Sequence, residues 1–428
     1  MEEAKPSKLD PYAVLRLPEF RSYIAARLCI TLAMQIQAVI VGWQIYDITQ
    51  DPLSLGLIGL AEAVPSITVS LYAGYVADMI ERKKIIMVVI TILLLCSALL
   101  LLFTLDVSQV LEQYGALPIF GVIFLSGIAR GFMGPAVFSF MPQLVVNKQL
   151  YANAITWSTT TWQAASLAGP AIGGLIYGFF GVTAAYAADA TLVLVSLLSF
   201  ALIGSKPLPE NVNPQNLMES LRTGIRFVFS NQIVLSAISL DLFAVLFGGA
   251  VALLPVFASD ILETGPEGLG FLRAAPAVGS VLIAVVMAYK PIEENAGKKM
   301  LWCVAGFGVC IILFGLSRSF WFSLVLLALS GAFDSISMIV RSTLIHTLTP
   351  EYMKGRVSSV NNIFVGSSNE IGAFESGFTA KLMGVVPAVV FGGVMTLVVV
   401  GVTAFKAEKL RELDLTPEPV SPGTLQKQ

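Results

Sequence analysis

The chain has 428 residues, of which 56% are hydrophobic and only 13% are charged, and its formal net charge is -2. Soluble proteins carry about 25% charged residues, so this composition excludes an ordinary soluble domain and predicts a helical protein that crosses a membrane many times. The net charge gives no indication of nucleic-acid binding. Because no basic patch with interleaved aromatics is present, we expect no nucleic-acid partner.

The N-terminal segment precedes the first apolar run. It is polar and contains Pro6, Pro11 and Pro18, so it lacks the apolar centre of a cleavable signal peptide. The four cysteines all fall inside apolar runs, and we therefore expect no disulfide.

Apolar runs of about 20 residues, the length needed to cross the hydrocarbon core, recur along the whole chain. They predict an all-α membrane protein with twelve transmembrane helices, at 22–45, 53–77, 84–104, 117–146, 152–179, 183–203, 232–257, 268–289, 300–317, 320–347, 356–382 and 386–405.

The cations test this count. With the N-terminus in the cytoplasm, 20 of the 26 Lys and Arg residues fall in cytoplasmic segments, and only Arg318 falls in an opposite loop. This asymmetry follows the positive-inside rule and would be lost if one span were added or removed. We therefore predict a multi-pass protein of the inner or plasma membrane with both termini in the cytoplasm.

The longest internal connection divides the chain into two halves. Its second part places Leu217, Leu221, Ile225 and Val228 on one helical face, which predicts an amphipathic helix at the cytoplasmic surface. The expected organisation is a six-helix bundle at 1–203, a linker at 204–231, a second six-helix bundle at 232–405 and a cytoplasmic tail at 406–428.

The two halves resemble sequence repeats. The segment 126–130, which ends in Arg130, precedes the segment 330–334, which ends in Asp334, by 204 residues. Repeats of this kind imply two bundles related by a pseudo-twofold axis, with the substrate site between them near the midplane.

The stretch 74–84 joins the second and third apolar runs and ends in a cluster of cations. It resembles the cytoplasmic loop signature of the major facilitator superfamily, although Met79 and Glu81 replace two of its usual residues. The resemblance implies a bridge between neighbouring helices that breaks during transport. The candidate residues of this bridge are Gly74, Asp78, Arg82, Lys83 and Lys84. A plain positively charged loop is the alternative.

Two further motifs resemble the same superfamily. Arg130, with Gly134 four residues later, resembles its fourth-span signature, which is implicated in proton coupling; a fixed ion pair between helices is the alternative. Span five contains Gly169-Pro170 and Gly173-Gly174, which resemble the signature of antiporters and exporters, with Ala165 in place of its first Gly. Small residues allow close approach of another helix, and Pro bends the span.

The residues of spans ten and eleven, 334–362 and 366–377, together with the start at 18–21, resemble the bacterial branch of the superfamily that includes the enterobactin exporter and drug-efflux proteins. This resemblance covers nearly all twelve spans. It implies secondary transport out of the cytoplasm and leaves the substrate open.

Ionisable residues inside spans are costly and usually face the bundle interior. The candidates for proton coupling are Glu370 first, Asp241 second, and then Arg130, Glu62 and Asp334. Arg341 shares a helical face with Asp334 and is a candidate for gating or for structural pairing. Arg273 and Lys381 lie near the outer surface, where we expect them to snorkel.

In this superfamily the cavity is lined mainly by spans one, four, seven and ten. The corresponding candidates in this chain are Gln35, Gln37, Phe138, Phe247 and Ser337, and span five adds Trp157, Trp162 and Gln163. Aromatic faces with amides suit a bulky, partly apolar ligand. Packing against neighbouring helices is the alternative role for each of them.

Several activities are excluded or disfavoured. The chain has no phosphate-binding Gly-Lys-Ser/Thr loop, and its single histidine, His346, has no metal-ligand spacing around it, so we expect no catalytic residues, metal or cofactor. The sequence therefore predicts a monomeric secondary transporter that exports a siderophore-like or drug-like small molecule by proton antiport. The alternatives are a lysophospholipid transporter, an uptake symporter and a membrane sensor.

Overall fold

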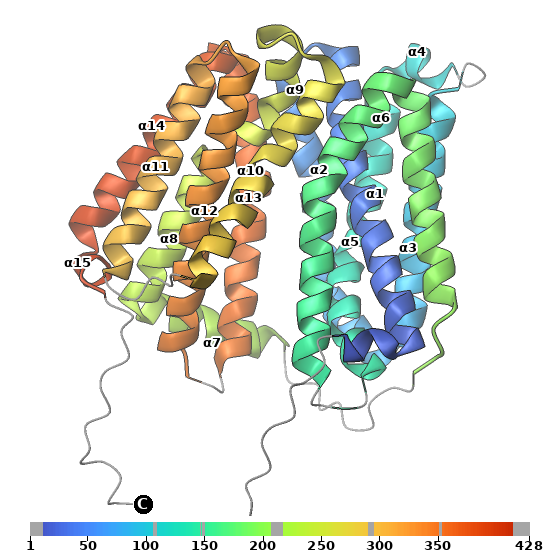
Figure 1. Cartoon of the computed structure of the whole chain (residues 1–428), viewed down its shortest axis with the longest axis horizontal. Helices are drawn as coiled ribbons and strands as arrows, with labels where there is room; N and C mark the ends of the chain where they lie inside the picture. Colours follow the sequence, from blue (N-terminus) through green and yellow to red (C-terminus); the bar gives the residue numbers. More distant parts are fainter. Residues whose placement is uncertain are drawn as a thin grey trace, which may run out of the picture.

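The computed structural model describes residues 12–105, 109–145, 147, 150–206, 217–289, 295–350 and 353–413, and over these residues it consists of helices without strands (Figure 1). The first group of helices comprises η1 (Ala13–Arg16), α1 (Pro18–Thr49), α2 (Pro52–Met79), α3 (Arg82–Phe103), α4 (Val110–Tyr114), α5 (Leu117–Leu144) and α6 (Tyr151–Ala201). The second group comprises α7 (Leu217–Ser230), α8 (Gln232–Phe247), η3 (Ala250–Leu253), α9 (Leu254–Val256), η4 (Phe257–Ile261), α10 (Gly265–Tyr289), α11 (Ala296–Leu316), α12 (Phe320–Leu348), α13 (Lys354–Met383), α14 (Val385–Lys406) and α15 (Glu408–Arg411).

The helices agree with twelve membrane crossings. Ten helical stretches of the described residues are long and apolar enough to span a membrane. One of them, within α6, is two crossings, because Gly181 has φ 82° and ψ 173° and interrupts the 51-residue helix. A residue with a side chain would be strained at that positive φ. The twelfth crossing is α13, whose many polar residues make it less apolar than the other ten.

Span seven differs from the single helix that the sequence predicts at 232–257. Helix α8 ends at Phe247, and the chain continues through Gly248 and Gly249 into the short helices η3, α9 and η4. Such a break leaves backbone groups unpaired, which is tolerated in a membrane only where neighbouring groups satisfy them. The Ser376 hydroxyl supplies one such bond, because it donates to the Gly249 carbonyl at 3.2 Å.

Two segments outside the spans are held more closely than the sequence predicts. Helix α7 packs against α13: a Cβ on Gly224 would lie 2.9 Å from the Arg356 carbonyl oxygen. Val228 is fully buried on α7, whereas Ile225 is exposed; the side chains of Leu217 and Leu221 lie outside the described residues. The predicted tail begins with α15, which packs against the start of α11 through Leu410.

Each group of helices has its own apolar interior. The first group contains two clusters of buried apolar residues, one around Phe140 and one around Tyr186. The second group contains a third cluster, around Leu344. The fourth cluster lies around Phe257 and contains Val39 of α1, so it joins the two groups.

We call the side where α1 begins and α14 ends the terminal side, and the opposite side the distal side. The helical groups stand apart at the terminal side and come together at the distal side (Figure 1). One close contact there is between α6 and α10. A Cβ on Gly174 would lie 2.6 Å from the Cα of Gly270, so the two backbones meet without intervening side chains.

Candidate functional site

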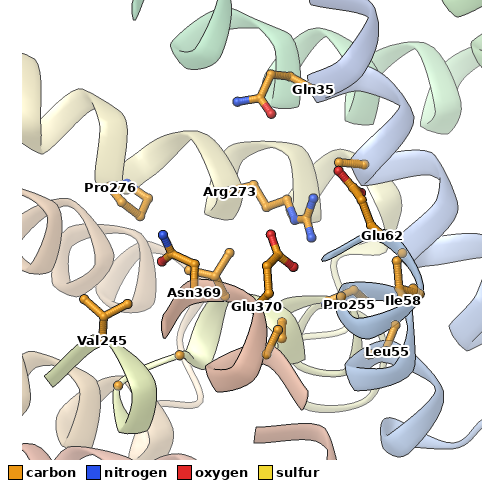
Figure 2. Close-up of a pocket in the computed structure, with 18 of the residues that line it drawn as sticks. Gln35, Leu55, Ile58, Glu62, Val245, Pro255, Arg273, Pro276, Asn369 and Glu370 are labelled. Atoms are coloured by element: carbon orange, nitrogen blue, oxygen red, sulfur yellow. The ribbon is translucent and has the colours of Figure 1, made fainter. Parts of the chain in front are cut away.

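A cavity of about 490 Å³ lies between the two helical groups, within the usual range for small-molecule sites. The first group contributes α1, α2 and α5, and the second contributes α8 and α10 to α13 together with the broken segment after α8. Most of the lining is apolar. Its ionisable and amide side chains, several of which are drawn in Figure 2, are Gln35, Gln37, Glu62, Arg130, Arg273, Asp334, Asn369 and Glu370.

Arg130 anchors the polar wall of the first group. Its guanidinium forms an ion pair with Glu62 of α2 and donates from Nη2 to Oε1 of Gln37 on α1 at 2.9 Å. The Arg130 and Glu62 side chains are 13% and 29% exposed, so water screens the pair only partly. One cation thus joins three helices through two contacts, one with Glu62 and one with Gln37.

Arg273 does not snorkel to the surface as the sequence predicts. It lies on α10 in the cavity wall, where its guanidinium points into the space between Glu62 and Glu370 (Figure 2). Its Nε is buried and has no hydrogen-bond partner in the described part of the chain. A Cβ added to Gly42 of α1 would lie 3.8 Å from its Nη2, so the side chain is directed toward the first helical group and away from lipid.

The second group supplies two carboxylates to the cavity, Glu370 of α13 and Asp334 of α12. Neither forms an ion pair within the described residues. Glu370 faces α2, because a Cβ added to Gly59 would lie 3.1 Å from its Oε2. Asn369 beside it was not singled out from the sequence, since an amide in so polar a helix gives no distinguishing signal. With Glu62, the cavity holds three carboxyl groups against two guanidinium groups.

Asp241 lies outside this cavity. It forms an ion pair with Arg341, which joins α8 to α12, and both side chains are only 6% exposed. Arg341, which shares a helical face with Asp334, thus has its ion pair with Asp241 of a neighbouring helix. A carboxylate held this way by a buried cation has a structural partner, which sets it apart from Glu370.

Some of the predicted cavity residues line the cavity, and others lie outside it. Gln35 and Gln37 line the cavity, whereas Trp157 packs against Tyr12 with ring centroids 5.8 Å apart. The remaining described candidates lie outside the lining: Trp162 and Gln163 are exposed on α6, Phe247 ends α8, and Ser337 is buried in α12. The side chain of Phe138 lies outside the described residues.

The glycines of α6 pack as closely as their spacing predicts. A Cβ on Gly169 or Gly173 would lie 2.6 Å from Cβ of Gln35 or 3.0 Å from Cα of Ile36, both on α1. Pro170 lies inside the helix, and its carbonyl oxygen would be 2.9 Å from a Cβ on Gly270. This face of α6 therefore contacts both α1 and the second helical group.

The distal side carries polar links between the groups. Lys381 does not simply snorkel, because its Nζ lies 2.8 Å from Oδ2 of Asp51, in the turn between α1 and α2. Tyr46 at the end of α1 donates a hydrogen bond to Asp260 of η4. These links and the helix contacts close the distal side of the cavity.

The stretch 74–84 lies at the terminal side. Lys83 donates to the backbone carbonyls of Ala201, at 3.2 Å, and Ile203, so it holds the end of α6. Lys84 pairs with Glu81 at 3.0 Å in an exposed contact, which contributes little to stability. Arg82 begins α3, and the side chains of Gly74 and Asp78 lie outside the described residues.

No cluster of three or more His, Cys, Asp or Glu side chains that could hold a metal ion occurs among the described residues. The carboxyl groups that the cavity presents are those of Glu62, Asp334 and Glu370.

Comparisons with known proteins agree with this architecture. The family described as "Transmembrane secretion effector", a major facilitator family, matches residues 9–425. The chain is 27% identical over 412 residues to the enterobactin exporter EntS of Shigella dysenteriae and to that of Escherichia coli, covering 94% of this chain and 95% of each relative.

Among solved structures, the fold is similar to the POT family transporter PepTSo, with a TM-score of 0.70 at 15% identity, covering 93% of this chain and 99% of that one. It is also similar to a bacterial homologue of the human lysosomal transporter Spinster in an inward-facing, unoccupied conformation, with a TM-score of 0.67 at 16% identity, covering 91% and 97%. At these identities the similarity concerns the fold alone.

Proposed function

The chain belongs to the transmembrane secretion effector family of the major facilitator superfamily, and from this premise we propose that it exports a small molecule from the cytoplasm in exchange for protons. The membership makes it a multi-pass membrane transporter and not an enzyme. The observation that carries the proposal is the cavity between the two helical groups, which holds five ionisable side chains and is closed at the distal side.

Alternating access is the mechanism that this arrangement supports. The two groups are joined at the distal side by side-chain links and by glycine contacts, both of which can separate without unfolding either group. Each group keeps its own apolar interior during such a movement. A rocking motion would then close the terminal side and open the distal side around the same cavity.

The direction of transport follows from the charges. The terminal side carries the cation-rich segments, which the positive-inside rule assigns to the cytoplasm. The cavity would therefore load from the cytoplasm in the conformation described here. The glycine motif of α6, which resembles that of exporters, supports the same direction.

Glu370 is the leading candidate for the proton carrier. It lies in the cavity opposite α2 and forms no ion pair within the described residues, so no fixed partner occupies its carboxyl group. Glu62, by contrast, is already paired with Arg130. Asp241 is a weaker candidate than its sequence position implied, because Arg341 neutralises it outside the cavity.

The proposed substrate class is based on the relatives. Enterobactin exporters match over nearly the whole chain, so we propose a siderophore-like or amphipathic drug-like solute. A largely apolar cavity with amides and opposite charges is compatible with a bulky solute of mixed polarity.

The test is transport into proteoliposomes whose lumen is more acidic than the medium, with enterobactin and tetraphenylphosphonium as probes. Wild type should accumulate at least one probe only when the gradient is present. Glu370→Gln should abolish gradient-driven accumulation while exchange of labelled for unlabelled probe continues. Glu375→Gln, on the same helix but outside the cavity lining, is the matched control and should behave as wild type. Undiminished gradient-driven uptake by Glu370→Gln would overturn its role, and no movement of either probe under any gradient would overturn the function.

A further inference from the structure

A second cavity of about 310 Å³, which we call the crevice, lies between α2 and α13. Its lining on α2 is Glu62, Ala63, Ser66, Ile67 and Ser70, and its lining on α13 is Ile363, Gly366, Ser367 and Glu370. Glu62 and Glu370 also line the main cavity, so the two spaces meet at these carboxylates.

The shape of the crevice follows from how α2 and α13 diverge. At the distal side the helices touch, because a Cβ on Gly377 would lie 2.9 Å from Cα of Gly56. Contact persists as far as Gly59 and Glu370. Beyond that level the helices separate, and a Cβ on Gly366 would have no atom within 4 Å. The crevice therefore occupies the opening of a V whose apex is distal.

The walls of the crevice are small or apolar away from its inner end. Ile67 and Ile363 are 39% and 44% exposed and belong to opposite helices. Between them lie serine and glycine residues, whose small size leaves the space open. The Ser70 hydroxyl donates a hydrogen bond to the Ile67 carbonyl of its own helix at 2.9 Å, so it needs no partner in the crevice.

The inner end of the crevice is acidic. Among the residues that the structure describes, neither Lys nor Arg lines the crevice, whereas Glu62 and Glu370 both do. Glu62 is paired with Arg130, whereas Glu370 forms no ion pair with Arg273 or any other described residue, so Glu370 is the carboxylate available to a positively charged ligand. The main cavity as a whole holds one more carboxyl than guanidinium group. An anionic ligand would meet net repulsion here, and a cation would not.

We propose that the crevice binds the apolar body of an amphipathic organic cation, whose charge lies at Glu370, and that it admits such a molecule sideways from the bilayer into the main cavity. This inference rests on the proposed function and narrows it, because it assigns the solute a charge and a route. The crevice lies on the terminal half of α2 and α13, so the route begins in the leaflet on the terminal side. A solute that partitions into the membrane would then never need to cross the aqueous opening.

The probes for the test are tetraphenylphosphonium and tetraphenylborate, which have nearly the same size and apolar surface but opposite charge. Their equilibrium binding to the full-length protein in nanodiscs, without any gradient, isolates the crevice from transport. The blocking variant is Gly366→Trp, whose side chain enters open space. The matched control is Gly401→Trp on α14, because a Cβ at Gly401 also has no atom within 4 Å.

Wild type should bind the phosphonium at least about tenfold more tightly than the borate. Gly366→Trp should weaken phosphonium binding about tenfold, and Gly401→Trp should leave it unchanged. If Gly366→Trp fails to fold, Ser70→Phe on the opposite wall repeats the test. Equal binding of both probes, no binding of the phosphonium, or unchanged binding by a folded blocking variant would each overturn the proposal. Weakened binding by the blocking variant, together with no transport by wild type, would support the crevice and refute the antiport function.

Discussion

Lys381 of α13 and Asp51 of the turn between α1 and α2 form an ion pair across the distal side, with Nζ 2.8 Å from Oδ2. The same carboxylate begins α2, because its Oδ1 accepts a hydrogen bond from the Leu53 amide at 3.1 Å. One side chain therefore links the two helical groups and caps a helix of the first.

The first prediction separates these two tasks. Asp51→Asn keeps a good helix cap but removes the charge, so it should weaken the distal closure without unfolding α2. We expect a larger population with the distal side open. This population can be measured from the electron–electron distance between nitroxide amino acids that replace Glu112 and Arg318, both of which are exposed at the distal side. Lys381→Gln, which removes the other partner, should give the same shift. A shift in only one variant would contradict the assignment.

The second prediction concerns pH. Burial raises the pKa of Asp51, but the bonds from Lys381 and the Leu53 amide outweigh it, so its pKa lies below the usual 3.8. The stabilisation is present above pH 3.8 and is lost as the pH falls through the lowered pKa. The distal distance should thus be the same at about pH 7.5 and about pH 5. A larger distal distance at about pH 5 than at about pH 7.5 in the wild type, with no such pH dependence in Asp51→Asn, would contradict this.

The third prediction tests the helix contact. Gly174→Ala places a methyl group against the backbone of Gly270 and of Pro266, which cannot move as a flexible side chain would. Overpacking of this kind costs about 1–3 kcal/mol and would act on the distal-closed conformation only. The same nitroxide pair should report the opening. Gly121→Ala, where no atom lies within 4 Å of the added Cβ, is the control. Equal effects of the two substitutions would argue against a contact that must separate.

The fourth prediction concerns the buried pair of Asp241 and Arg341, whose side chains are each 6% exposed. Asp241→Asn should lower stability by about 3–5 kcal/mol, because it leaves Arg341 buried without its counter-charge. Asp241→Asn combined with Arg341→Met should restore most of that loss. Thermal unfolding in detergent measures both. A double variant no more stable than the single one would show that the pair does not act as a unit.

The crossings of the membrane could be predicted from sequence because their length and apolarity are set by the bilayer. Prolines mark two of the starts, at Pro18 and Pro52. The break in span seven was missed, since Gly248 and Gly249 lie in a run that is apolar enough to continue a helix. Its signal was the glycine pair itself, close to Pro255.

The cavity was predictable only in part. Glu62, Arg130, Asp334 and Glu370 were identified because a charge inside a span is costly, and the structure brings all four to one cavity. Asp241 was grouped with them, because sequence cannot show which carboxylate already has a buried partner. The error for Arg273 has a similar cause. Lipid is as apolar as a protein interior, so the apolar pattern of α10 does not reveal which face points inward.

The chain reverses direction within α6 at the single residue Gly181, and this couples the movements of spans five and six. Because no loop separates spans five and six, a displacement of one is transmitted directly to the other through a single joint. Span five contacts α10 at Gly174. Span six ends at Ala201 and Ile203, whose backbone carbonyls accept hydrogen bonds from Lys83. The contact of α6 with α10 at the distal side and the contact of α6 with Lys83 at the terminal side are thus connected through one continuous element. Loss of either contact should therefore change the position of α6 at the other.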